Sequence, residues 1–269
     1  MNYLFDGSNW EWLTSGNNLR FLLEGFLVNL EIAAIAIVFS LIFGLLLALA
    51  RLSTFRPLSL TAGLWVDVWR NLPLIFIILY LALALPAPWK DFYEDNVPGF
   101  FPEALQSGRV FAGILGLVLY NSAVIAEIMR AGILSLDRGQ GEAAASLGLT
   151  YPQQLRYVIL PQGLRRMVPA TVSQLITLNK DTTLVSIIAI EEVMRHGRIL
   201  SSGFTAFVGG VEAPVLQVFI FIGLLFVVTN LALSRFSRRL EIRERKRTGG
   251  TAGPVAGLED QVALAAESS

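Results

Sequence analysis

Several charged side chains lie inside segments that are otherwise apolar enough for a lipid bilayer. Lys180 and Asp181 fall near the middle of one such segment, and Arg70 falls inside another. A charged residue at the centre of a membrane helix costs about 2.5 to 3.5 kcal/mol, so such residues usually face protein or a water-filled path. We therefore expect these side chains, with the hydroxyls of Thr182 and Thr183, either to line a polar pathway or to lock neighbouring helices together.

Glu127 also has two interpretations. Its carboxylate can contribute to the same polar pathway. However, Arg130 follows three residues later on the same predicted helix face, which is the spacing of a simple ion pair. For Glu127 we favour the ion pair.

The sequence offers no catalytic or metal centre. It contains no cysteine and a single histidine, His196, which excludes thiolate sites and leaves too few ligands for a metal cluster. A pH-sensing role for His196 is one interpretation, but an ordinary interface residue is the one we favour. No glycine-rich phosphate-binding loop occurs, so any ATP must be bound by another chain.

Residues 139–161 form a polar island in this otherwise hydrophobic chain. Asp137 and Gln140 have the spacing of a capping box, which predicts a helix start. Gly148 stands where a left-handed residue would end that helix, because glycine adopts positive φ at little cost. The spacing therefore predicts a first short helix that stops at Gly148.

A second helix follows directly. Thr150 and Gln153 repeat the capping-box spacing, and Pro152 loses no useful hydrogen bond in a first turn. Pro161 should prevent the helix from continuing past Leu160. The island thus reads as a water-exposed helix-turn-helix between two membrane spans.

The composition places the rest of the chain in a membrane. Hydrophobic residues make up 54% of the 269 residues and charged residues only 16%, whereas soluble domains carry about 25% charged residues. A bilayer core about 30 Å thick needs roughly 17 to 25 apolar residues per helix. The segments that qualify are 22–50, 61–86, 110–134, 168–190 and 213–234.

The basic residues set the predicted orientation. Fourteen Lys and Arg residues flank the spans on one side and five on the other, and the richer side should be cytoplasmic. We therefore expect an external N-terminal segment, 1–21, and a transmembrane domain, 22–248, that contains a cytoplasmic loop at 135–167. The polar stretch 249–269 should be a disordered cytoplasmic tail, and the basic run before it should contact anionic membrane lipid. Net charge is zero, which gives no sign of nucleic-acid binding.

The residues of the cytoplasmic loop resemble the EAA loop found in the membrane subunits of bacterial ABC importers. The matching residues are Glu142, Ala143, Ala144, Gly148, Val158, Leu160 and Pro161, with Val158 standing where the family commonly has Ile. Segments 69–74, 120–133 and 180–188 resemble the polar amino acid branch of these permeases, except that Asn71 and Leu72 replace its Gly-Thr pair.

The resemblance implies an all-α type I ABC importer permease fold with five transmembrane helices in the bacterial cytoplasmic membrane. It implies that two ATPase subunits, which carry ATP and Mg, would bind the loop at Glu142, Ala143, Ala144, Gly148, Leu160 and Pro161. The further partners that it implies are a second permease subunit, identical or different, and an external substrate-binding protein. Its cargo would be a polar amino acid, with glutamate or a close relative as the first guess. Arg70, Glu127, Lys180, Asp181, Thr182 and Thr183 would then line the substrate pathway.

Two other classes of protein fit the sequence less well. An ion-coupled secondary transporter would also explain buried carboxylates, but it would normally show inverted repeats with interrupted helices, and none is found here. A membrane-embedded enzyme would need a nucleophile with a base or a metal cluster, which this sequence does not supply. For the loop alone, a less favoured interpretation is that it merely packs under its own helical bundle.

Overall fold

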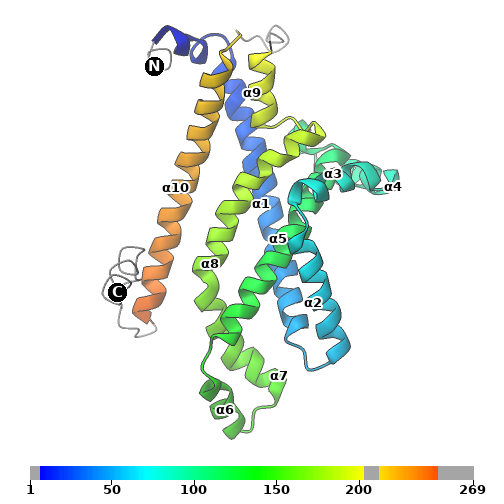
Figure 1. The fold of residues 1–269 in the computed structure, drawn as a ribbon, viewed down its shortest axis with the longest axis vertical. Helices are drawn as coiled ribbons and strands as arrows, with labels where there is room; N and C mark the ends of the chain where they lie inside the picture. Colours follow the sequence, from blue (N-terminus) through cyan, green and yellow to red (C-terminus); the bar gives the residue numbers. More distant parts are fainter. Residues whose placement is uncertain (1–6, 203–211, 248–269) are drawn as a thin grey trace, which may run out of the picture.

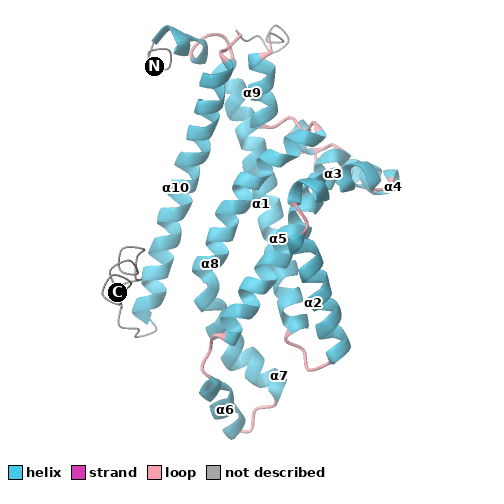
Figure 2. Cartoon of the chain, in the orientation of Figure 1, coloured by secondary structure: helices cyan, strands magenta, loops and turns pink. Residues whose placement is uncertain are grey.

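The computed structural model describes residues 7–202 and 212–247, and within these ranges every regular element is a helix (Figure 2). The α-helices are α1 (Asn18–Arg51), α2 (Arg56–Asn71), α3 (Leu74–Ala84), α4 (Ala87–Asn96), α5 (Gly108–Leu134), α6 (Arg138–Ser146), α7 (Tyr151–Gln154), α8 (Leu160–Asp181), α9 (Val193–Ser201) and α10 (Val215–Arg247). Short 3₁₀ helices at Gly7–Leu13, Glu103–Leu105 and Thr182–Ile188 and a π-helical turn at Leu155–Ile159 complete the described elements. The expected all-α class is confirmed; the tail 249–269 lies outside the described residues.

The long helices run along the molecule, with small helices at both ends (Figure 1). α6 and α7 form one end, α9 lies at the other, and α3 and α4 project sideways from the bundle. α1 and α5 form the central pair, and they approach closely at Gly44. A Cβ there would lie 2.7 Å from Cγ2 of Ile125, so this position requires glycine.

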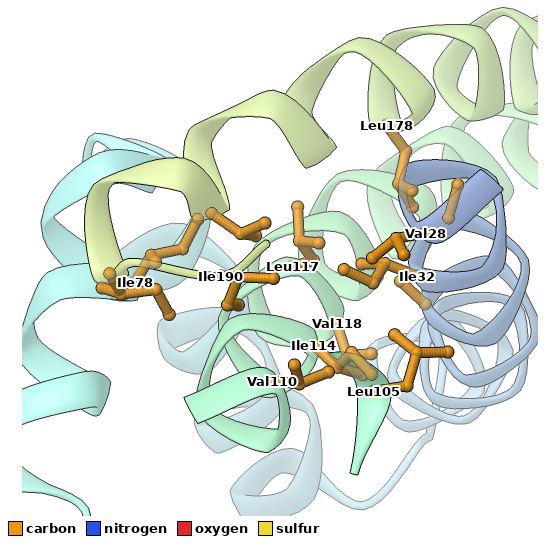
Figure 3. Close-up of a cluster of buried hydrophobic side chains, with 14 of the residues drawn as sticks. Val28, Ile32, Ile78, Leu105, Val110, Ile114, Leu117, Val118, Leu178 and Ile190 are labelled. Atoms are coloured by element: carbon orange, nitrogen blue, oxygen red, sulfur yellow. The ribbon is translucent and has the colours of Figure 1, made fainter. Parts of the chain in front are cut away.

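A buried apolar cluster joins α1, α3, α5 and α8 (Figure 3). Its members include Ile32 of α1, Ile78 of α3, Leu117 of α5 and Leu178 of α8, all with fully buried side chains. The apolar cluster lies nearer the α9 end of α1 than the α6 end, because Ile32 lies in the first half of that helix. It fixes the helices from which the polar residues project.

The second predicted span is not a straight helix. α2 and α3 meet at an angle of 101° across Leu72 and Pro73. Leu72 has an extended backbone, with φ −83° and ψ 138°, because a residue before proline is disfavoured in the helical region. The prediction of one continuous helix over 61–86 is therefore wrong.

The fourth predicted span is also interrupted. α8 ends at Asp181, a 3₁₀ segment covers Thr182–Ile188, and Ala189 takes a left-handed conformation with φ 62°. Lys180 and Asp181 thus stand at the end of an α-helix and not in the middle of one. The prediction of a single helix over 168–190 is wrong.

Three helical stretches in the described part are long and apolar enough to cross a membrane, namely Asn18–Arg51, Gly108–Leu134 and Val215–Arg235. The bent pair α2 and α3 makes a fourth if it counts as one span. α8 does not pass the same test, since it carries polar residues such as Arg165, Gln174 and Lys180 along its length. By length and composition the helices therefore give three or four spans.

Candidate functional site

The loop at 135–167 begins with a capped helix, as predicted. Asp137 accepts a 2.8 Å hydrogen bond from the backbone N–H of Gly139 and caps α6. The side chain of Gln140 does not complete a capping box, because its oxygen accepts from Nε2 of Gln162 at 3.0 Å. The predicted start is confirmed, and Gln140 instead ties α6 to α8.

Gly148 ends α6 as expected. Its φ is +77°, which places it in the left-handed region. Its N–H donates to Ala145 O at 2.9 Å, and the N–H of Leu149 donates to Ala144 O at 3.3 Å. These two bonds make a Schellman motif, which satisfies the last carbonyls of the helix and turns the chain sharply.

The second loop helix starts as predicted but does not stop. Gln153 accepts a 2.9 Å hydrogen bond from the N–H of Thr150, the reciprocal bond of a capping box. The chain then widens into the π turn, where Leu160 N–H donates to Leu155 O, five residues back. Pro161 follows in the first turn of α8, so the predicted stop after Leu160 is wrong.

The π turn explains why Pro161 is tolerated. In an α-helix its ring would clash with the carbonyl of residue 157, and its missing N–H would leave that carbonyl without a partner. A wider turn before the proline relieves this crowding. The loop is consequently joined to α8 through a continuous but irregular helix, and π turns often mark functional sites.

The loop presents an exposed face at the α6 end of the molecule (Figure 1). Glu142, Ala143 and Gly148 are exposed, whereas Ala144 is buried. Leu147 is 81% exposed, although it is a large apolar residue. Sequence reasoning missed Leu147; the signal was an apolar residue directly before the helix-ending glycine of a polar loop.

A cluster of charged side chains connects the ends of α1, α2 and α5. Nη1 of Arg51 lies 2.6 Å from Oε2 of Glu127, and Arg130 pairs with the other oxygen of the same carboxylate. Asp67 lies 3.8 Å from Arg51 and 3.7 Å from Arg70. The predicted ion pair of Glu127 and Arg130 is present, and Arg51 is a member that sequence reasoning missed.

The six predicted pathway residues do not lie together. Arg70 and Glu127 belong to the cluster around Arg51 at the end of α1, whereas Thr182 accepts a 3.2 Å hydrogen bond from Asn29 in the first half of α1. Twenty-two residues of helix separate Asn29 from Arg51, which corresponds to about 33 Å. The structure therefore divides the predicted pathway into two distant groups.

The second group surrounds the end of α8. Lys180 is exposed, Asp181 is partly buried and Thr182 is fully buried. The hydroxyl of Thr182 donates to Asn179 O, and that of Thr183 donates to Lys180 O, both at 2.8 Å. The two hydroxyls thus close the turn that carries Lys180 and Asp181.

A buried polar contact beside this group was also missed. Nδ2 of Asn29 donates to Glu192 at 2.9 Å, and Oδ1 of Asn29 accepts from Val193 N–H at 3.1 Å. Burial raises the pKa of the Glu192 carboxyl, against the hydrogen bond from Asn29 that lowers it. His196, one turn further, stacks on Phe21 with ring centroids 3.7 Å apart, so it is an interface residue, as favoured from the sequence.

Comparison with known proteins agrees with this geometry. Residues 40–244 match a family described as binding-protein-dependent transport system inner membrane component. A probable glutamine ABC transporter permease protein of Bacillus subtilis is 37% identical over 230 residues, covering 86% of this chain and 96% of that protein. An arginine transport system permease protein of the same organism is 32% identical, over 83% of this chain and 92% of that protein.

A glutamate/aspartate import permease protein of Escherichia coli is 31% identical, over 83% of this chain and 93% of its own length. Among solved structures, an amino acid ABC transporter with histidines matches with a TM-score of 0.67 and 28% identity, over 85% of this chain and 94% of that chain. A methionine ABC transporter shares the fold with a TM-score of 0.56 at 21% identity, over 82% of this chain and 95% of that chain. The chain therefore belongs to the family of inner membrane components of binding-protein-dependent transport systems.

Proposed function

We propose that this chain is the permease subunit of an ATP-driven ABC importer that carries a polar amino acid across the bacterial cytoplasmic membrane. The observation that carries the proposal is the loop of α6 and α7, which ends the bundle with an exposed Glu142 and a Schellman turn at Gly148. The names of the relatives support amino acid import, since they are permeases for glutamine, glutamate/aspartate and arginine.

The proposed assembly contains two permease subunits, two ATPase subunits and an external binding protein. ATP and Mg would be bound by the ATPase subunits, which would hold the loop at Glu142, Ala143, Ala144, Gly148, Leu160 and Pro161. We add Leu147 to this set because its exposed apolar side chain directly precedes Gly148 on the same loop.

The proposed topology has five spans, with the N-terminus outside. In it the bent pair α2 and α3 forms the second span, and α8 with the segment Thr182–Ile188 forms the fourth. Asymmetry of the basic residues supports this orientation. Because the chain has no cysteine, single cysteines placed at Ser146 and at Asn96 can be labelled in intact cells with an impermeant thiol reagent. Labelling at Asn96 and protection at Ser146 are expected, and the reverse would invert the topology.

Glutamate or a close relative is the first proposed substrate, and Asp181 with its neighbours is the proposed contact region. Asp181→Asn should lower uptake while membrane levels and ATP hydrolysis persist, because it removes a charge and keeps the shape. Asp95→Asn, on exposed α4, is the matched control. Normal uptake by Asp181→Asn would leave that residue a packing role.

Co-purification tests the proposal as a whole. An ATPase chain should copurify with the tagged permease, and in the reconstituted complex with its binding protein a polar amino acid should stimulate ATP hydrolysis. Uptake that follows an ion gradient without ATP would support the secondary-transporter alternative instead. The amino acid that stimulates hydrolysis most identifies the substrate.

A further inference from the structure

The loop at 135–167 is attached to the hairpin of α1 and α2 through one tyrosine hydroxyl. The hydroxyl of Tyr151, the first residue of α7, donates a 3.1 Å hydrogen bond to the backbone oxygen of Leu52, ninety-nine residues earlier in the chain. Within residues 7–202 and 212–247, this is the one hydrogen bond that joins the loop to the hairpin of α1 and α2. Leu52 caps the end of α1, where helix carbonyls have no partner of their own.

The residue that precedes Leu52 belongs to the charged cluster. Arg51 precedes Leu52 and pairs with Glu127 of α5, and its backbone oxygen accepts a 2.8 Å bond from the hydroxyl of Ser59 in α2. A displacement of Leu52 by the tyrosine therefore moves the residue that holds α1 and α2 to α5.

These contacts close a ring. α5 continues through Leu134 into the loop, and Nη1 of Arg166 in α8 donates to Ser135 O at 2.8 Å, which ties α8 to the end of α5. The loop then returns to α1 through Tyr151, and α1 returns to α5 through Arg51 and Glu127. In such a ring, the loop cannot shift relative to α5 without changing the Tyr151 contact or the Arg51 ion pair.

Packing does not fix this position by itself. An open surface pocket of about 410 Å³ lies between the hairpin and α7, and its mostly apolar lining includes Leu49, Leu58 and Leu155. Tyr151 lies on its rim and is 44% exposed. Since close packing is what normally sets helix positions, the open pocket leaves the hydroxyl of Tyr151 as the specific polar contact between α7 and the hairpin.

We infer that Tyr151 is a positioning residue for energy coupling, which passes movement of the loop to the hairpin of α1 and α2 and so to the ion pair of Arg51 and Glu127. The inference rests on the proposed function. It adds a second route out of the loop, besides the direct continuation of the chain through the π turn into α8.

The test compares two substitutions that remove the same atom. Tyr151→Phe deletes the hydroxyl that binds Leu52, whereas Tyr157→Phe deletes one from a tyrosine in the π turn that is 63% exposed. Both are measured in the full reconstituted complex, as amino acid transported per ATP hydrolysed. A neutral hydrogen bond corresponds to about 3- to 10-fold in an equilibrium, so we expect Tyr151→Phe to lower that ratio by about this factor with ATP hydrolysis unchanged, and Tyr157→Phe to match the wild type.

Each other outcome overturns the inference. Wild-type coupling in Tyr151→Phe would show that the hydroxyl passes no movement, and equal losses in both variants would assign the effect to the ATPase contact surface. A stability change without a change in the transport ratio would make the contact structural alone. Co-purification of the ATPase chain with both variants separates these results from a failure of the proposed function, in which no ATPase would copurify with the wild type either.

Discussion

The side-chain amide of Asn29 in α1 donates a 2.9 Å hydrogen bond to the carboxylate of Glu192, 163 residues later, and both side chains are fully buried. The same carboxylate accepts from Arg195 N–H at 2.9 Å and caps α9. The side-chain Oδ1 of Asn29 accepts from Val193 N–H. The Asn29 side chain therefore satisfies both the Glu192 carboxylate and the Val193 N–H at the start of α9. This contact fastens α9 to α1.

Replacing Asn29 by leucine should destabilise the protein. The substitution leaves the buried Glu192 carboxylate and the Val193 N–H short of a partner, which costs about 2 to 4 kcal/mol. Denaturant titration of the detergent-solubilised protein measures the change in the free energy of unfolding. Asn96→Leu is the matched control, because Asn96 is exposed and bonds within its own helix to Phe92 O, and it should stay within about 0.5 kcal/mol.

A double variant checks the cause of that loss. Asn29→Leu combined with Glu192→Leu removes both polar partners, so it should recover part of the stability lost in the single variant. If the double variant is less stable than Asn29→Leu alone, the loss of stability comes from altered packing and not from the unpaired carboxylate.

The stability of the α9 end should depend on pH through His196, whose Nδ1 lies 2.6 Å from Phe21 O. Burial lowers the pKa of the imidazole, while the Phe21 carbonyl, Glu191 and Glu24 raise it and Arg195 lowers it. The unfolded chain therefore binds more protons between the folded pKa and about 6.5, and stability should fall as the pH falls through this window.

His196→Gln isolates this effect, because the amide can still donate to Phe21 O but does not titrate. The difference in free energy of unfolding between wild type and variant should change as the pH falls below about 6.5. The comparison is needed because Glu192 acts in the opposite direction. Its raised pKa makes stability fall as the pH rises above the unfolded value. A pH-independent difference would contradict the lowered pKa.

Gly148→Val should disrupt the loop without disturbing the bundle. No atom within 4 Å would meet a Cβ there, so the penalty comes from the φ of +77° alone. A left-handed L-residue costs about 1 to 2 kcal/mol, which is roughly 5- to 30-fold in the population of the native turn. Amino acid uptake should fall by a factor in that range, while membrane insertion is unchanged.

Gly141→Val provides the control, because it adds the same side chain to the same loop in helical backbone, where the nearest atom is Ile159 Cδ1 at 4.0 Å. Its uptake should stay near that of the wild type. Equal losses at both positions would mean that bulk on the loop surface, and not the turn, limits transport.

The contrast between Gly148 and Asn29 shows what the sequence could predict. Helix starts and the left-handed turn of the loop depend on neighbouring residues, so Asp137, Gly148 and Thr150 were identified correctly. Family membership followed from the same short segment, and it is confirmed by the match over residues 40–244. The contact of Asn29 with Glu192 joins residues far apart in the chain, and no local spacing reveals it.

Two of the wrong predictions involve prolines. The predicted span 61–86 includes Pro73, but the residue before this proline is extended and the helices diverge by 101°. Pro161 predicts a helix stop, but a π turn accommodates it and the helix continues. Proline removes one donor and constrains its predecessor, but tertiary packing decides whether the chain bends, widens or stops.

The ion pair of Arg51 and Glu127 should matter more than the surface pairs of the same protein. Glu127→Gln leaves two largely buried guanidinium groups, those of Arg51 and Arg130, without their carboxylate. We expect a loss of about 1 to 3 kcal/mol in the free energy of unfolding. Glu24→Gln is the matched control, because its pair with Arg20 is largely exposed and should contribute less than about 1 kcal/mol.

Asp67 provides a sharper test of the same cluster. Its carboxylate lies 3.8 Å from Arg51, so it can partly replace Glu127 as the partner of that guanidinium. Asp67→Asn alone should cost little because Arg51 keeps its 2.6 Å contact with Glu127. The double variant with Glu127→Gln should cost more than the two single variants together, since Arg51 then loses both partners. Strict additivity would show that Asp67 is too far from Arg51 to take over, and that Glu127 alone holds α1 to α5.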